Sequence, residues 1–255
     1  MSIWLEEGAG ILNNNLIYLP EVGSTNAWAK ENLDRFADAG AVYSTHQTAG
    51  RGRLGRTWTD APGQGLYYSV VIKTPLAQPA TLPLYASLAA ASALKQRYNV
   101  DCQIKWPNDL LLNGKKIVGI LCEVAPDGHS LVVGIGINLA QPQEYFDMAG
   151  LPHGTSLLLQ GVNVDLDTDP EWLAQYMTDF GFDRALYTYE EQGFAPYREQ
   201  YKAQCVNLGR RVTYDGGAGI AKDIDEEGRL IVHDESGDTH VFTGEVSVKG
   251  IYGAV

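Results

Sequence analysis

The chain has 255 residues, of which 45% are aliphatic, aromatic or cysteine, enough to build a large core and to exclude an intrinsically disordered protein. Its 19 basic and 31 acidic residues give a net charge of −12, which disfavours a DNA- or RNA-binding protein because phosphate contacts need a basic surface. No apolar run approaches the ~18 residues of a membrane span. The amino terminus has neither a basic lead nor an apolar signal core, so we expect a cytoplasmic protein without a membrane partner.

The three cysteines do not suggest a site. Cys102, Cys122 and Cys205 are an odd set without C-x-x-C spacing, which fits neither a disulfide framework nor a zinc site. Cys122 lies in an apolar run and is interpreted as a small core residue. The five histidines are scattered, so the sequence predicts no Ser/His or Cys/His nucleophilic pair.

Helix and strand signals alternate through the amino-terminal part of the chain. Ser24 is a good N-cap residue for the segment that follows it, and Gly40 lies beyond the expected helix end. Pro83 suits the first turn of a second helix, which is rich in alanine and leucine. In chain order we predict a strand around 11–19, a helix after Ser24, strands at 41–45 and 66–73, and a helix from Pro83 to about Tyr98.

From 103 to 139 the pattern is that of a β-meander. Runs rich in isoleucine, valine and leucine are separated by Asn113-Gly114 and Asp127-Gly128, which favour short hairpin turns. Strands joined by such turns pair antiparallel. The later segment 169–204 has helical spacing of apolar residues, with Asp169 as a cap and an interruption at Gly181 or Gly193.

After Cys205 the sequence changes to short β-like runs between 208 and 252, punctuated by Asp-Gly, Glu-Gly and Ser-Gly pairs. Several short strands in so short a segment favour a small closed β-barrel. We therefore predict two domains, residues 1–206 and 207–255. The predicted fold class is α+β: a mixed, mainly antiparallel sheet with helices packed on it, plus a small C-terminal β-barrel.

The most informative loop runs from Gly50 to Arg56. Gly50, Gly52 and Gly55 formally satisfy the G-x-G-x-x-G pattern of dinucleotide-binding proteins. That pattern opens a helix and is followed ~20 residues later by an acidic residue for the ribose. Here a loop and a strand follow, and no aspartate or glutamate occurs from 61 to 100, so nicotinamide binding is disfavoured.

The same loop carries three arginines in an otherwise acidic protein. Glycines allow close approach of the backbone to a ligand, and guanidinium groups match phosphate and carboxylate oxygens. These residues favour a clamp for a polyanion such as the phosphates of a nucleotide, over a solvated surface loop or a disordered Arg-Gly segment. Such a loop would open for substrates and close over the product, so we expect mobility without ligand.

Two further stretches could carry chemistry, each with a simpler alternative. The run from Lys105 to Leu110 could hold phosphate and hydrated Mg²⁺, or it could only form a turn at Pro107. Lys115 and Lys116 point to opposite faces of a strand, and periodicity leaves open which one enters a site. Gly119, Gly134 and Gly136 could leave a slot for a flat ligand, or could allow close packing of another element.

Five motifs occur together in a fixed order that resembles the biotin protein ligases over residues 15 to 250. The later run Gly244–Lys249 is similar to the element with which that family's C-terminal barrel reaches the nucleotide. The motifs are Ser24-Thr25-Asn26, the G-R-G-R-x-G-R-x-W segment Gly50–Trp58 preceded by Gln47, Lys105–Leu110, Lys116-x-x-Gly119-Ile120-Leu121-x-Glu123, and Gly134-x-Gly136-Ile137-Asn138.

The resemblance implies a class II synthetase-like biotin/lipoate ligase catalytic domain followed by a barrel similar to Src-homology-3 domains. It implies that biotin and ATP form biotinyl-5′-AMP and pyrophosphate, after which biotin is transferred to a lysine of a carrier protein. The partner would be the biotin-carrier domain of acetyl-CoA carboxylase or a related carboxylase. ATP with Mg²⁺ and biotin would be substrates and ion, with no tightly bound prosthetic group.

The resemblance also implies roles for individual residues. Lys116, Arg51 and Arg53 would be catalytic, and Asp109 would hold Mg²⁺. The residues implied in biotin binding are Ser24, Thr25, Asn26, Gln47, Gly50, Arg51, Gly52, Arg53, Lys116, Gly119, Gly134 and Gly136. The residues implied in ATP binding are Arg51, Arg53, Arg56, Trp58, Lys105, Asn108, Asp109, Asn138 and Lys249.

Two features depart from the family pattern. Lys249 stands where an arginine is common, and a lysine cannot make the bidentate contact of a guanidinium group. Only 23 residues precede Ser24, too few for the winged-helix domain of the family's repressors, so we expect the ligase-only form without DNA binding. A homodimer is left open, and the alternatives are a lipoate-protein ligase or a non-catalytic sensor of biotinyl-adenylate.

Overall fold

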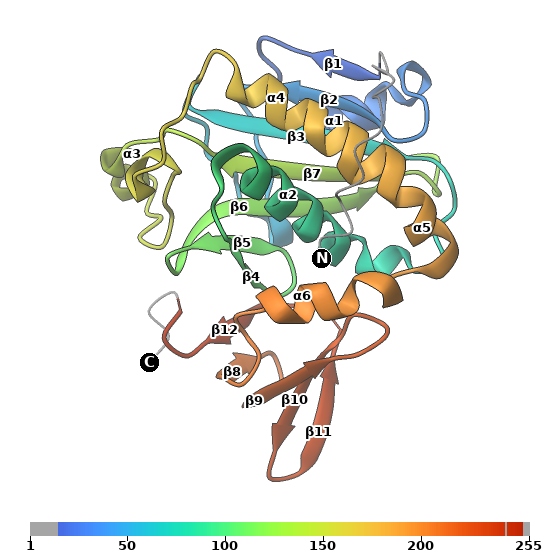
Figure 1. Cartoon of the computed structure of the whole chain (residues 1–255), viewed down its shortest axis with the longest axis vertical. Coiled ribbons are helices and arrows are strands. Elements are labelled where there is room, and N and C mark those ends of the chain that lie inside the picture. Colours follow the sequence, from blue (N-terminus) through green and yellow to red (C-terminus); the bar gives the residue numbers. More distant parts are fainter. Residues whose placement is uncertain (1–14, 243, 252–255) are drawn as a thin grey trace.

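The computed structural model describes residues 15–242 and 244–251, except for the side chains of 184 and 185. Its largest element is a seven-stranded sheet with helices on both faces (Figure 1). The strand order is β1-β2-β3-β7-β6-β5-β4, and only the β1–β2 pair is parallel. The strands are β1 Leu16–Tyr18, β2 Gly40–Ser44, β3 Gly65–Ile72, β4 Gln103–Lys105, β5 Asp109–Leu112, β6 Lys115–Val124 and β7 Leu131–Asn138.

The sheet confirms the predicted mixed, mainly antiparallel topology. The meander is present as β4 to β7, with Gly114 and Gly128 at positive φ in its turns, as the hairpin signals predicted. Part of the strand expected around 11–19 lies outside the described residues. The helices are α1 Thr25–Glu31, α2 Leu82–Tyr98, α3 Gln143–Met148, α4 Asp169–Tyr176, α5 Arg184–Gln192 and α6 Arg198–Gln204.

The two faces of the sheet carry separate hydrophobic clusters. Tyr68 and Val70 of β3 pack into the larger cluster beneath α2, whereas Val71 packs with Ala29 of α1 on the opposite face. This alternation follows from the two-residue period of a strand, and because helices cover both faces, β3 is buried along its whole length. The face beneath α1 is the one that continues into the site.

Local signals place both helices that were predicted in the first half of the chain. Ser24 caps α1, its hydroxyl oxygen accepting the Ala27 N–H at 3.4 Å. Pro83 lies in the first turn of α2, and Asn99 ends this helix in the left-handed region at φ 55°. Here the sequence and the structure agree because capping depends on only a few neighbouring residues.

The helical segment 169–204 differs in detail from the prediction. Thr168, not Asp169, is the cap residue, since α4 begins at Asp169; the buried Asp169 carboxylate accepts hydrogen bonds from Arg97 at 2.7 Å and Tyr98 at 2.6 Å instead. Gly181 does not break the helix but lies in a π-helical stretch, Met177–Asp183, that joins α4 to α5. Gly193 ends α5, as one of the two predicted interruptions.

The C-terminal segment forms a second, five-stranded antiparallel sheet below α6 (Figure 1). Its order is β11-β10-β9-β8-β12, so β11 and β12 are the edges, and the pairings of the described residues contain no ladder between them. The predicted small β domain is therefore present. Its strands are β8 Arg211–Tyr214, β9 Gly217–Ile224, β10 Leu230–Asp234, β11 Gly237–Val241 and β12 Val246–Val248.

Trp106 and Asn207 join the two sheets. The Trp106 indole donates to Gly228 O at 2.9 Å, and the Trp106 N–H donates to the Asn207 side chain at 2.8 Å. The division at 206/207 falls within this connection and stays a prediction. No helix of the described part of the chain is long and apolar enough to cross a membrane.

Candidate active site

A cavity of about 430 Å³ opens on the α1 face of the large sheet. Its walls come from β6 and β7, the Gly50–Trp58 loop, the segment after α3 and the connection between β11 and β12. Every residue expected to bind a substrate lines this cavity except Gly50 and Lys249. The structure thus brings together residues from all five distant sequence motifs, although lining a cavity does not by itself assign a role.

The Gly50–Trp58 loop folds back on itself as a hairpin-shaped loop, with an isolated antiparallel β-bridge between Arg51 and Thr57. The Gly52 N–H donates to Arg56 O at 2.7 Å, and the Trp58 N–H donates to Gly50 O at 3.0 Å. Leu54 and Gly55 form its turn at φ 56° and 74°, the left-handed conformation of a two-residue hairpin turn. Gly55 adopts it freely, whereas a leucine in this region costs about 1–2 kcal/mol.

Gly50 acts beneath the hairpin and not against a ligand. A Cβ at this position would overlap the carbonyl oxygen of Trp58 and lie 2.6 Å from Gln47 Nε2, so glycine is needed for close packing. The predicted contact of Gly50 with biotin is therefore not seen among the lining residues. Its effect on the site is indirect, through the positions of Trp58 and Gln47.

The glycine slot expected at Gly119 and Gly136 contains a side chain of the protein. A Cβ at Gly136 would lie 2.8 Å from the Trp58 indole, and one at Gly119 would overlap the same ring. The sequence suggested either a slot for a flat ligand or close packing of another element. The flat group packed against these glycines is the Trp58 ring of the protein, and Trp58 itself lines the cavity. Gly134 differs, since its missing Cβ makes room for Asn26.

We call Ser24, Thr25, Asn26 and Gln47 the neutral end of the cavity. All four are buried, with exposed fractions between 3% and 6%. The Thr25 N–H donates to Gln47 Oε1 at 2.9 Å, which fixes the Gln47 amide. Three of the four side chains start from the N-terminus of α1, and Gln47 lies in the loop after β2, where its bridge to Val22 and its hydrogen bonds with Thr25 hold it.

Asn26 is held by partners on β6. Its amide donates to Leu121 O at 3.2 Å and to Glu123 Oε2 at 2.9 Å, while Glu123 Oε1 pairs with Lys30 at 2.7 Å. Burial raises the pKa of Glu123, but the hydrogen bonds from Lys30 and Asn26 more than compensate, so the net shift is downward. Glu123 is therefore an ionised acceptor near neutral pH.

We call Arg53, Lys105, Asn108, Asp109 and Lys116 the charged end of the cavity. Lys116 Nζ lies 2.6 Å from Asp109 Oδ1 and 5.6 Å from the centre of the Trp58 ring. Burial lowers the pKa of Lys105, opposed by the nearby Asp109 carboxylate. An anion placed here would compensate these partly buried cations.

The structure decides between the two adjacent lysines. Lys116 is partly buried and lines the cavity, whereas Lys115 is exposed and does not. The backbone of Lys116 is fixed by hydrogen bonds with His153 O at 2.8 Å and the Thr155 N–H at 2.9 Å. A pairing with a segment far along the chain thus orients Lys116, and no local periodicity could indicate it.

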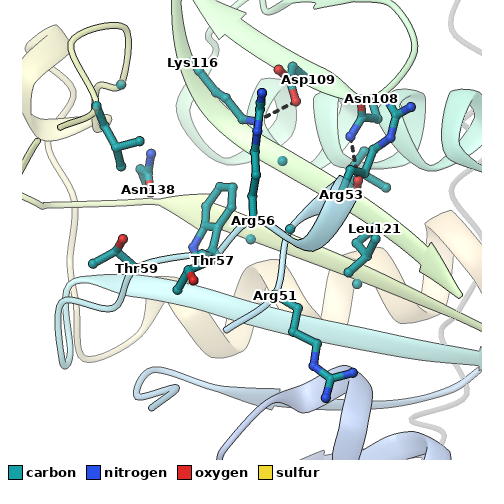
Figure 2. A pocket seen from close by; sticks show the side chains of 18 of the residues that line it. Arg51, Arg53, Arg56, Thr57, Thr59, Asn108, Asp109, Lys116, Leu121 and Asn138 are labelled. Atoms are coloured by element: carbon teal, nitrogen blue, oxygen red, sulfur yellow. Dashed lines mark hydrogen bonds and ion pairs between the residues drawn. The ribbon is translucent and has the colours of Figure 1, made fainter. Parts of the chain in front are cut away.

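The hairpin contacts residues beside both sheets. Figure 2 shows Arg53 reaching Asn108, with a 2.8 Å hydrogen bond, while Arg51 extends away from the Lys116–Asp109 pair. Arg53 also donates to Gly244 O at 3.1 Å, and Arg56 pairs with Glu245 at 2.5 Å. Arg53 therefore has hydrogen-bond partners in both parts of the chain, Asn108 before β5 and Gly244 before β12.

Lys249 was expected to bind ATP, but its position in the structure does not place it in the cavity. Its side chain is exposed and does not line the cavity, while Gly244, Glu245 and Ser247 of the same motif do. The motif thus reaches the site through its beginning and not through Lys249. The contribution of Lys249 to ATP binding stays a prediction.

Sequence reasoning missed the wall formed by α3 and the segment that follows it. Tyr145, Phe146 and residues 150–154 line the cavity, and the Tyr145 hydroxyl donates to Thr59 O at 2.7 Å. The adjacent aromatic residues just after the Asn138 strand were the only available signal.

Burial raises the pKa of Tyr67, another lining residue, with the neighbouring Asp60 carboxylate adding to the shift.

The cysteines play no nucleophilic part that the structure supports. Burial raises the pKa of Cys102 and Cys122 to about 12 and that of Cys205 to about 11, so all three are protonated thiols near neutral pH. Cys122 packs against the core, as predicted, although it is not completely enclosed. Within the described residues, no group of three or more acidic, histidine or cysteine side chains could form a metal site.

The sequence matches known families over both parts of the chain. Residues 18–139 match the biotin/lipoate A/B protein ligase family, and residues 208–249 match the biotin protein ligase C-terminal domain. The chain is 30% identical to the bifunctional ligase/repressor BirA of Bacillus spizizenii, over 93% of this chain and 75% of that protein. It is 34% identical to the biotin–[acetyl-CoA-carboxylase] ligase of Mycobacterium tuberculosis, over 88% of this chain and 85% of that protein.

The fold leads to the same family. The biotin protein ligase of Aquifex aeolicus in complex with biotin and ATP superimposes with a TM-score of 0.76 at 30% sequence identity. The superposition covers 92% of this chain and 98% of the Aquifex protein. Because sequence and fold agree over nearly the whole length, this chain belongs to the biotin protein ligase family.

Proposed function

We propose that this chain activates biotin with ATP, forming biotinyl-5′-AMP and pyrophosphate, and then transfers biotin to a lysine of a biotin-carrier domain. The observation that carries the proposal is that one cavity joins a neutral hydrogen-bonding end to a charged end that contains Arg53, Lys105 and Lys116. A ureido head group suits the first and a carboxylate with phosphates suits the second. The carrier domain of acetyl-CoA carboxylase is the acceptor we propose, from the names of the relatives.

In the first step, the biotin carboxylate oxygen attacks the α-phosphorus of ATP, and the bond to pyrophosphate breaks. Two anions must approach each other, so cationic groups near both are needed more than a nucleophile of the protein. Lys116, at the charged end, lies over the Trp58 ring, and there one ammonium would neutralise both the carboxylate and the phosphate oxygens. Arg53 and Lys105 would bind the remaining phosphate charge.

In the second step, the acceptor lysine amine attacks the acyl carbon, and AMP leaves. The amine must lose a proton, and the Asp109 carboxylate next to Lys116 is an ionisable acceptor at the charged end. Until then the reactive acyl-adenylate must be kept from water, which is a role for the hairpin that carries Arg53. Asn138 and Arg56, which both line the cavity, would bind the nucleotide.

Mg²⁺ fits this site only as an ion that arrives with ATP. Asp109 supplies a single carboxylate, which already contacts Lys116. The described residues contain no group of three or more side chains that could hold a metal ion by themselves. Mg²⁺ is commonly held by one or two carboxylates together with substrate phosphates. Asp109 would hold it here, and the ion would neutralise phosphate charge.

The decisive experiment is pyrophosphate release by the purified chain, with biotin or lipoate as the acid substrate. The proposal predicts ATP-dependent release with biotin and none above background with lipoate. Transfer is then measured with labelled biotin and a biotin-carrier domain. Release with lipoate alone would identify a lipoate-protein ligase, and binding without release would identify a sensor.

We also propose that the chain has no DNA partner and is located in the cytoplasm, with a homodimer left open. The net charge of −12 supports the absence of DNA binding. A gel-shift assay at modest salt with biotin and ATP tests it, because a sequence-specific shift that survives competitor DNA would contradict this part of the proposal.

A further inference from the structure

A second, smaller cavity adjoins the charged end of the main cavity. It measures about 140 Å³ and lies between the beginning of α2, the end of β6 and the turn between β9 and β10. Arg53, Asn108 and Leu121 are among the residues that line both cavities. The two cavities therefore share a wall, and the proposed function makes no use of the second one.

Arg53 is the charged residue of this shared wall. Its guanidinium group donates to the Asn108 side chain at 2.8 Å and to Gly244 O at 3.1 Å, and Figure 2 shows the bond between Arg53 and Asn108. In the proposed function Arg53 binds phosphate in the main cavity. The second cavity thus reaches the main one beside the group that would hold the phosphate of the adenylate.

The rest of the second cavity is mostly apolar. Its walls include Pro83 and Leu84 of α2, Cys122 of β6 and Phe242 after β11. Phe242 is 62% exposed, and the neighbouring lining residue Glu227 is exposed as well, so the cavity opens to solvent on this side. An elongated apolar group with a polar tip would fit a space that is apolar along its walls and polar where it meets Arg53.

The transfer step calls for such a space. The adenylate would occupy the main cavity, and its AMP part stays there until the acyl carbon has been attacked. The acceptor lysine therefore needs a path to the acyl carbon that does not displace the nucleotide. A cavity of about 150 Å³ is large enough for benzene, so the second cavity has room for the four methylene groups and the amine of a lysine side chain.

We infer that the second cavity receives the side chain of the acceptor lysine during transfer, with the amine placed at the wall formed by Arg53 and Asn108. This rests on the proposed function, to which it adds a binding site and a direction of entry. The apolar walls contact the methylene groups. The Arg53 guanidinium shifts toward the phosphate to let the amine through.

The same walls prepare the amine for attack. Only a neutral amine is a nucleophile, and both apolar surroundings and a nearby guanidinium group favour the neutral form of a lysine. Its first proton leaves to water at the open side. The bond from nitrogen to the acyl carbon then forms, the bond from that carbon to the phosphate oxygen breaks, AMP leaves with the electron pair, and the nitrogen gives a second proton to Asp109.

The test narrows the second cavity from two walls, with Cys122→Leu on β6 and Ala80→Leu before α2. Both residues line the second cavity and neither lines the main one. We expect transfer from enzyme-bound biotinyl-5′-AMP to a biotin-carrier domain, measured in a single turnover, to fall about tenfold or more, because small displacements of reacting groups are this costly. Pyrophosphate release with biotin and ATP should stay near the wild-type rate.

Two controls isolate the lysine side chain. Val124→Leu enlarges an exposed residue of the same strand that lines neither cavity, and it should leave both steps unchanged. Hydroxylamine is a small amine without a side chain, so its reaction with the bound adenylate should be normal in the narrowed variants. Melting temperatures check that each variant is folded.

Three results would overturn a proposal. Wild-type transfer to the carrier domain in both folded narrowed variants would overturn the lysine site. An equal loss with hydroxylamine and with the carrier domain would also overturn it, because the substitutions would then act on the adenylate itself. A wild-type chain that releases no pyrophosphate with biotin would instead overturn the proposed function.

Discussion

The two ends of the cavity are built in opposite ways. The neutral end uses buried side chains from α1 and the segment after β2, each with protein hydrogen bonds on its inner side, such as Asn26 with Glu123 and Ser69. The charged end depends partly on an exposed hairpin whose arginines contact Asn108 and Glu245. The buried side chains of the core thus preorganise the neutral end. The charged end is assembled from contacts between long side chains.

This difference suggests a division of labour. Rigid, fully bonded groups can select a substrate by the direction of their hydrogen bonds, since reorienting them would leave buried polar atoms unpaired. Long cationic side chains tolerate changes in their partners, which suits phosphates that arrive, react and leave. We therefore expect substitutions at the neutral end to alter KM and selectivity, and substitutions at the charged end to alter rate and retention.

The largest effect is expected for Lys116→Ala. Removing the ammonium between carboxylate and phosphate should lower the rate of pyrophosphate release by about 10²–10³, the usual loss for a key electrostatic donor. Lys115→Ala is the matched control, because Lys115 is the exposed neighbour outside the cavity and should keep near-normal activity. The reverse pattern would assign the role to Lys115.

Gly134→Ala tests whether the neutral end depends on the position of Asn26. The new methyl group would overlap Asn26 Oδ1, so the amide must move, and overpacking of this kind costs about 1–3 kcal/mol. We expect a KM for biotin about tenfold higher, with kcat much less affected. Gly23→Ala is the control, because nothing lies within 4 Å of its added Cβ. A normal KM in folded Gly134→Ala would contradict preorganisation.

Arg53→Gly tests retention by the charged end. The variant loses hydrogen bonds to Asn108 and Gly244 and gains backbone freedom, so the hairpin should open about fivefold more often. Adenylate would still form but escape sooner and label a bystander protein that lacks a biotin-carrier domain. Arg53→Lys keeps the charge and should label less. If Arg53→Gly forms adenylate yet labels no more bystander than wild type, Arg53 does not retain the intermediate.

The smallest effect concerns the turn between β6 and β7, which lies outside the cavity lining. The Ser130 hydroxyl, chiefly, together with the His129 and Ser130 N–H groups, lowers the pKa of Asp127 to about 2, from an ordinary value of 3.8. Because the folded pKa is lowered, this stabilisation is complete above 3.8 and is lost as pH falls toward 2. Chemical unfolding should show wild type more stable than Asp127→Asn at pH 6, with the difference disappearing near pH 2. A difference independent of pH would contradict this origin.

The sequence by itself determined the features that depend on neighbouring residues or on a repeated pattern. Ser24 predicts its helix by capping, the Asp127-Gly128 turn predicts an antiparallel pair, and the arginine-glycine run predicts an anion site. Motif order was sufficient to indicate the family, because each motif carries a separate requirement of the chemistry. These inferences need no knowledge of which segments meet in space.

Only the tertiary structure decided which atoms share the cavity. The periodicity of a strand does not distinguish its two faces. That Lys116 and not Lys115 lines the cavity is seen only in the structure, where β6 pairs with the segment near Thr155. Trp58 fills a slot between glycines that lie on two strands, and the exposed position of Lys249 follows from the path of β12. Ser69 had no sequence signal at all, because Asn26, to which its hydroxyl donates, is distant in the chain and only the fold places the two together.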